Sequence, residues 1–118
     1  MSKEFTKSEV KELAEFIVNA LDDKKGKDID LIDISEQSSL ADYFVVCSGS
    51  SSTQIKALAD EVEKQVEEQY GFKAKYSEGY ESRKWVLLDY IDIVVHIFSE
   101  DTRDYYQLER LWMSEKDN

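Results

Sequence analysis

Residues 85–98 read WVLLDYIDIVVHIF, two apolar runs separated by a short segment that carries two aspartates. Apolar, β-branched runs joined by a few turn residues are typical of a β-hairpin. With Tyr90 and Ile91 at the tip, the predicted register places Trp85 opposite His96. The domain is therefore expected to contain a sheet that includes this hairpin.

Alternation along the hairpin separates two faces. One face is uniformly apolar and is expected to be the core; its members are Val86, Leu88, Ile93, Val95 and Ile97. The other is apolar in its middle (Trp85, Leu87, Val94 and His96) and ends in Asp89 opposite Asp92. An apolar centre with acidic ends suits a basic, partly apolar protein partner. A covering helix would explain the same pattern, so both interpretations remain open at this point.

The other periodic segments predict an α/β domain. An i, i+3, i+4 stripe from Val10 to Leu21 predicts a first helix, preceded by a capping box of Thr6 and Glu9. Strands are expected at 29–34, 43–47 and, weakly, 73–77, with a second helix between the last two that ends at Gly71. Without a linker-like stretch, residues 1–118 are expected to form one domain with a mixed five-stranded sheet flanked by helices.

A last helix is predicted over residues 102–112. Its spacing places Tyr105, Leu108 and Trp112 on one face, which is expected to close the core. Arg103 falls on a different side and is expected to be exposed.

Composition narrows the choice of partner and of cellular location. The 118 residues include 26 acidic and 15 basic side chains, for a formal net charge of -11. Such a chain is repelled by phosphate backbones, so no direct nucleic-acid binding is expected, whereas a basic protein would be attracted. No apolar run is long enough for a membrane span, and no secretory signal is present. The lone Cys47 suits a reducing compartment, and we expect a cytoplasmic location.

Few residues offer catalytic or metal chemistry. Cys47 and His96 are the sole Cys and His, which is poor material for a nucleophile pair or a zinc site. The turn Gly49-Ser50 resembles a nucleotidyltransferase phosphate turn, but no Asp-x-Asp pair follows it in the next strand. A helix cap made by Ser51 and Gln54 is the simpler explanation. We therefore expect no catalytic site, cofactor or metal.

Four blocks of sequence resemble the ribosomal silencing factor (Iojap) family. They are DYFVVCSGSSS and IKALAD at 42–52 and 55–60, EGY at 78–80, WVLLDY and DIVVHIF at 85–90 and 92–98, and YYQLERLW at 105–112. The resemblance extends from about residue 8 to 113, and four blocks in the same order are far more specific than one short motif.

The resemblance implies a nucleotidyltransferase-like fold without transferase activity. It also implies binding to large-subunit ribosomal protein fourteen on the intersubunit face, which sterically prevents the small subunit from joining. Translation is thereby lowered when nutrients are scarce, and some members act in large-subunit assembly. An Arg-rich, acid-poor leader is missing, which favours a bacterial rather than an organellar version.

Together, the resemblance and the hairpin pattern predict a docking site. The residues expected to contact the partner are Trp85, Leu87, Asp89, Tyr90, Asp92 and His96. Many family members carry a small residue or Gly near the hairpin tip, where this chain has Tyr90-Ile91, so the tip is a departure from the family pattern.

An apolar face without its partner favours self-association, and a homodimer is expected when the chain is free. The alternatives are a divergent nucleotidyltransferase-like or nucleotide-binding domain, and a protein-interaction module unrelated to ribosomes.

Overall fold

The computed structural model describes residues 5–106, and its elements follow the predicted order of helix, two strands, helix, three strands and helix. They are α1 (Lys7–Asp23), β1 (Lys27–Asp33), β2 (Tyr43–Gly49), α2 (Ser52–Tyr70), β3 (Tyr76–Glu78), β4 (Trp85–Asp89), β5 (Ile93–Ser99) and α3 (Glu100–Tyr106). Within the described residues, no helix is both long and apolar enough to cross a membrane.

The strands form one mixed sheet in the order β1-β2-β5-β4-β3. β2 and β5 are parallel at its centre, and every other neighbouring pair is antiparallel. The apolar run of β2 therefore lies between two strands, as its sequence predicts. The predicted mixed five-stranded α/β architecture is confirmed.

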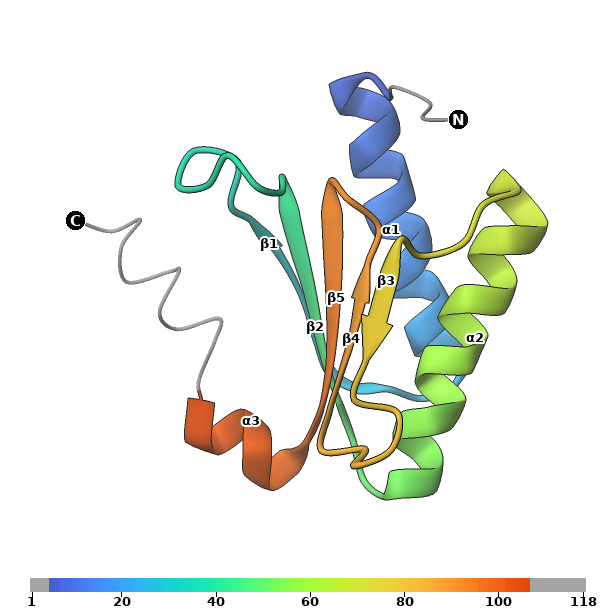
Figure 1. The fold of residues 1–118 in the computed structure, drawn as a ribbon, viewed down its shortest axis with the longest axis vertical. Helices are drawn as coiled ribbons and strands as arrows, with labels where there is room; N and C mark the ends of the chain where they lie inside the picture. The colour runs from blue at the N-terminus through green and yellow to red at the C-terminus, as the bar shows by residue number, and fades with distance from the viewer. Residues whose placement is uncertain (1–4, 107–118) are drawn as a thin grey trace.

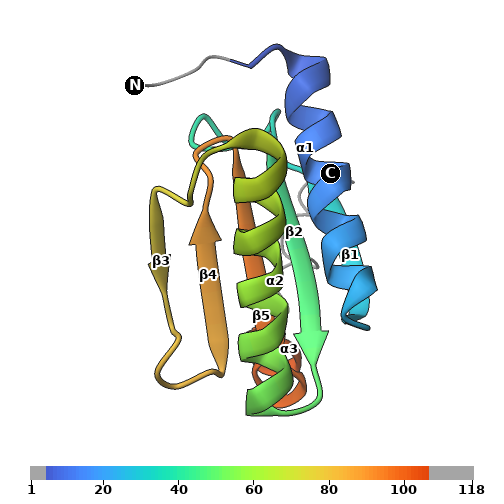
Figure 2. The same cartoon turned by 90° about the vertical axis from the view of Figure 1, so that its right-hand side faces the viewer.

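Helices α1 and α2 lie side by side and cover one face of the sheet (Figures 1 and 2). The side chains buried between these layers include the complete predicted core face of the hairpin: Val86, Leu88, Ile93, Val95 and Ile97. The capping box of α1 is present, since Thr6 Oγ1 accepts from Glu9 N at 3.2 Å and Thr6 N donates to Glu9 Oε1 at 2.9 Å. Gly71 ends α2 in the left-handed conformation (φ 81°).

The predicted register of the hairpin is wrong by two residues. Trp85 pairs with Phe98 rather than His96, and Asp89 pairs with Val94 rather than Asp92. Because the shift is even, each side chain keeps the face that the alternation assigned to it.

The tight turn at the hairpin tip explains the shift. Tyr90 N donates to Ile93 O at 2.8 Å, so Ile91 and Asp92 form the tip. Ile91 has a φ of 76°, in the left-handed region. A β-branched residue there is a conformational outlier and costs about 1–2 kcal/mol. A small residue or Gly would suit this position better, so Ile91 departs from what the backbone favours.

Helix α3 lies at one end of the opposite face of the sheet (Figure 1). Its orientation differs from the prediction, because Arg103 is buried and Tyr105 is 82% exposed. The Arg103 guanidinium donates to Ser48 Oγ and to Asp30 Oδ2, each at 2.9 Å. These bonds fix α3 against β2 and β1. Leu108 and Trp112 lie outside the described residues.

Candidate docking face

The sheet face opposite α1 and α2 is apolar, and among the described helices only α3 packs at one end of it (Figure 1). We call its seven side chains from the three central strands the outer face: Phe44, Val46, Trp85, Leu87, Val94, His96 and Phe98. Val46, His96 and Phe98 are buried, whereas the other four are half-buried. The half-buried side chains of the outer face therefore reach the surface, and the buried side chains of Val46, His96 and Phe98 pack beneath them.

The indole of Trp85 is held in place by neighbouring rings. Its Nε1–H donates to Nδ1 of His96 at 3.1 Å. The Trp85 and Phe98 ring centroids are 4.9 Å apart, and Phe44 meets His96 edge-on at 4.6 Å. An aromatic side chain whose rotamer is fixed before binding loses little conformational entropy when a partner docks. Trp85 is therefore well suited to anchor a partner.

His96 supports Trp85 as a neutral ring. Because Nδ1 accepts the indole hydrogen bond, the proton of the neutral imidazole lies on Nε2. Nε2 is buried and has no hydrogen-bond partner among the described residues. Burial lowers the pKa of His96 to about 4 from its ordinary value of 6.5. The centre of the outer face thus carries no positive charge at neutral pH.

The lowered pKa of His96 predicts a loss of stability in acid. As the pH falls below 6.5, the imidazole of the unfolded chain takes up a proton before the buried imidazole of the folded chain does, and this favours unfolding. The free energy of unfolding therefore declines progressively towards pH 4. At 1.36 kcal/mol for each pKa unit, the loss between pH 7 and 4 is about 3 kcal/mol. The measurement is urea unfolding of the native chain and of His96→Asn at both pH values.

The asparagine variant is the control for the acidic side chains, which titrate in both proteins. Its amide oxygen can replace Nδ1 as the acceptor for Trp85, and it does not titrate. We expect the native chain to lose more stability than His96→Asn over this range. Equal losses in the two proteins would contradict the assignment of a buried neutral imidazole.

Three carboxylates gather at the end of the outer face that carries the hairpin tip. Asp89 closes β4, and its Oδ1 accepts the Ile91 N–H at 2.7 Å. Asp92 lies in the turn, where its carbonyl accepts the Asp42 N–H at 2.8 Å. Burial and then the nearby Asp42 raise the pKa of Asp92. Like charges so close together favour the approach of a cation.

The predicted contact residues do not all lie on one surface. Trp85, Leu87 and His96 lie on the outer face, and Asp89 and Asp92 lie at its end. Tyr90 instead lies in the core beneath the helices. It is 6% exposed, and its ring centroid is 6.2 Å from that of Phe72. Its side chain is therefore not part of this surface.

The prediction named no residue from β2 or from the loop before it, although Phe44 belongs to the outer face and Asp42 lies at its acidic end. Phe44 and Asp42 come from β2 and the loop before it, and only the parallel pairing of β2 with β5 places them beside Val94 and Asp92. The run at 43–47 is apolar throughout and gives no sign that Phe44 reaches the surface. Contacts between strands that are distant in the sequence were needed to find them.

Cys47 and His96 cannot act together as a nucleophile and base. They occupy neighbouring positions on β2 and β5, but Cys47 points into the helix-covered core and His96 lies on the outer face. Burial also raises the pKa of the Cys47 thiol to about 12. The thiolate needed for nucleophilic attack is therefore disfavoured.

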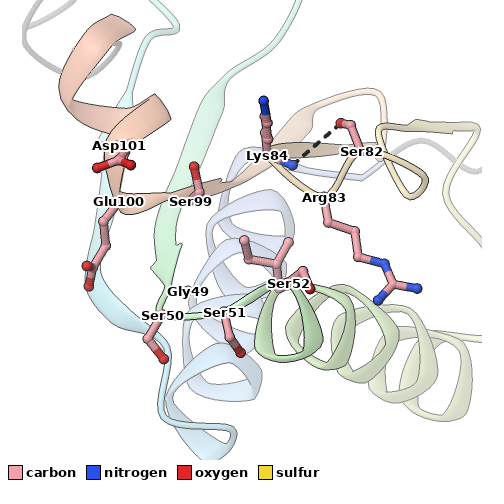
Figure 3. Close-up of a pocket in the computed structure, with 11 residues that line it drawn as sticks. Gly49, Ser50, Ser51, Ser52, Ser82, Arg83, Lys84, Ser99, Glu100 and Asp101 are labelled. Atoms are coloured by element: carbon pink, nitrogen blue, oxygen red, sulfur yellow. Dashed lines mark hydrogen bonds between the residues drawn. The ribbon is translucent and has the colours of Figure 1, made fainter.

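A polar pocket lies where the central strands end and α2 begins (Figure 3). It is lined mainly by the turn 49–52, by Ser82, Arg83 and Lys84, and by Ser99, Glu100 and Asp101. The Ser50 N–H and hydroxyl both donate to Gln54 Oε1, at 2.6 and 2.9 Å. The Gln54 N–H donates to Ser51 Oγ at 3.1 Å, so Ser51 caps α2 as predicted.

The Gln54 side chain accepts from Ser50 rather than from the backbone of Ser51, so only half of the predicted capping box forms. Donors that a phosphate would use are thus engaged within the chain. Over residues 5–106, no group of three or more His, Cys, Asp and Glu side chains is placed to hold a metal ion. These contacts favour a helix cap over a nucleotide site.

Comparison with known proteins places this chain in a family. The family profile described as "Ribosomal silencing factor during starvation" matches residues 7–118. The chain belongs to this family. It is 46% identical over 101 residues to the ribosomal silencing factor of Halalkalibacterium halodurans, covering 86% of each chain. It is 42% identical over 102 residues to that of Bacillus subtilis, again covering 86% of each.

A crystal structure of a Chromobacterium violaceum protein has a similar fold, with a TM-score of 0.84. It is 43% identical, and the match covers 87% of this chain and 85% of that one. A more distant relative, 28% identical, is the mouse protein named mitochondrial assembly of ribosomal large subunit protein 1. The match covers 83% of this chain and 44% of the mouse protein. Silencing factors and a protein named for ribosome assembly thus share this domain.

Proposed function

We propose that this silencing factor binds the large ribosomal subunit through its protein fourteen and sterically blocks joining of the small subunit. The observation that carries the proposal is the outer face, where Trp85 is held by His96 above a packed base and carboxylates gather at one end. Ribosomal proteins that contact RNA are typically basic, and the net charge of -11 favours such a partner. Bound in this way, the chain lowers translation when nutrients are scarce and acts without a cofactor.

The names of the relatives support this proposal. Silencing during starvation requires the factor to act on ribosomes, and the name of the mouse relative refers to the large subunit. A role in large-subunit assembly is compatible with the same contact, because a factor seated on the intersubunit face can remain there until the subunit is finished.

Sucrose-gradient sedimentation of a cell lysate at physiological salt tests the proposal. The chain is expected to migrate with free large subunits and to be absent from joined ribosomes. Addition of the purified chain to separated subunits should then reduce the peak of joined ribosomes. A chain that stays at the top of the gradient, or that migrates with joined ribosomes, would contradict the proposal.

The free chain is proposed to pair with a second copy through the same apolar face. Dimerisation would compete with docking, so binding has to be measured over a range of chain concentrations. If the two events share the face, the apparent affinity for the large subunit falls as the chain concentration rises into the dimeric range.

A further inference from the structure

Two loops that are distant in the sequence meet at one end of the sheet. The loop before β2 and the turn before β5 are joined because the Asp92 carbonyl accepts the N–H groups of Asp42 and Tyr43, at 2.8 and 3.1 Å. The first residues of the two parallel strands, Tyr43 and Ile93, are in register. The loop and the turn therefore lie at the same end of the sheet (Figure 1).

Each loop exposes a large apolar side chain there. Leu40 is 87% exposed and Ile91 is 53% exposed. Ile91 occupies the left-handed conformation that disfavours β-branched residues, and the Asp89 carboxylate holds its backbone N–H at 2.7 Å. The backbone of Ile91 is thus strained, and its side chain is exposed to solvent. Strained residues of this kind gather at functional sites.

The same edge is acidic. Asp42 and Asp92 are each half-buried, and neither forms an ion pair with any of the described residues. Two carboxylates without a cation, flanked by two exposed apolar side chains, repel phosphate. They attract a segment that combines Lys or Arg with apolar residues. We call Leu40, Asp42, Ile91 and Asp92 the tip edge.

We propose that the tip edge is a second contact strip, which holds a basic segment with apolar neighbours on the protein that docks on the outer face. This inference rests on the proposed function and extends the docking site beyond Trp85 around the end of the sheet. The outer face and the tip edge are continuous, because Phe44 and Val94 pair with each other just inside the two loops. Leu40 and Ile91 supply the apolar contacts, and the two aspartates receive the cation.

The test measures thermal unfolding and binding to purified large subunits for Ile91→Gly and Leu40→Ser. Ile91→Gly removes both the strain and the side chain, so it is expected to raise Tm by a few degrees while it weakens binding about fivefold or more. Leu40→Ser should weaken binding to a similar extent without a large change in Tm. A purely structural role for Ile91 would not move stability and affinity in opposite directions.

The charges are tested with the double variant Asp42→Asn and Asp92→Asn. It should bind more weakly than the native chain at low salt and show a smaller dependence of affinity on salt. Glu68→Gln is the charge control, because Glu68 is an exposed residue of α2 on the other side of the sheet. It should bind like the native chain.

The outcomes separate this inference from the proposed function. If the native chain does not bind large subunits, both fail. If Trp85→Ala loses binding while Ile91→Gly and Leu40→Ser keep native affinity, docking on the outer face stands and the tip edge is overturned. Repeating the measurements with purified protein fourteen and with ribosomal RNA decides the class of partner. Loss of affinity confined to the RNA would also overturn the inference.

Discussion

Trp85→Ala is expected to weaken binding to the large ribosomal subunit by about 30-fold or more, which corresponds to roughly 2 kcal/mol. The substitution removes the largest side chain of the outer face and leaves Nδ1 of His96 without its hydrogen bond. Because Phe98 and His96 hold the indole before docking, the native chain orders little when it binds. The variant loses both the apolar contact and this preorganisation.

The control for this experiment is Phe72→Ala. Phe72 is also half-buried, but it packs against Phe5, Tyr70 and Tyr90 on the helix-covered side of the sheet. Both variants should lose some stability, which thermal unfolding would record. Only Trp85→Ala should lose affinity in sedimentation with purified large subunits. Equal affinities for the folded Trp85→Ala variant and the native chain would remove Trp85 from the docking site.

The faces of the hairpin were predictable from the sequence, and its register was not. Alternation of side chains is local, so Val86, Leu88 and Val95 could be assigned to the core without knowing the turn. The register depends on which residues form the turn. A sequence gives no reason to place Ile91 at a positive φ, because the conformation is unfavourable for that residue.

The end of the chain illustrates a second limit. Helical spacing placed Tyr105 in the core and Arg103 at the surface, since an arginine is rarely buried without a partner. The partners exist, but they are Ser48 on β2 and Asp30 on β1, 55 and 73 residues away in the sequence. Specific polar contacts between distant segments determined which side of α3 faces the sheet. The same kind of contact joined Asp42 to the hairpin turn.

Gly79→Ala is expected to lower the free energy of unfolding by about 3 kcal/mol or more, a size typical of strain at a special backbone position. Gly79 has a φ of 94°, and a Cβ atom there would lie 2.0 Å from the Trp85 carbonyl oxygen and 3.1 Å from Val86 Cα. Both are backbone atoms of β4, so relief requires the first residues of that strand to move. The loop cannot easily retreat, because the Tyr80 hydroxyl donates to Glu63 on α2 at 2.7 Å.

Gly71→Ala separates the steric clash from the backbone conformation. Gly71 also has a positive φ, 81°, but a Cβ there would meet no atom within 4 Å. Its substitution should cost only about 1–2 kcal/mol, the penalty of the left-handed conformation for an L-residue. Urea unfolding of both variants measures the difference. Equal losses would mean that the approach of Gly79 to Trp85 does not hold β4 in place. A larger loss for Gly79→Ala, together with weaker binding to the large subunit, would show that this glycine positions Trp85 for docking.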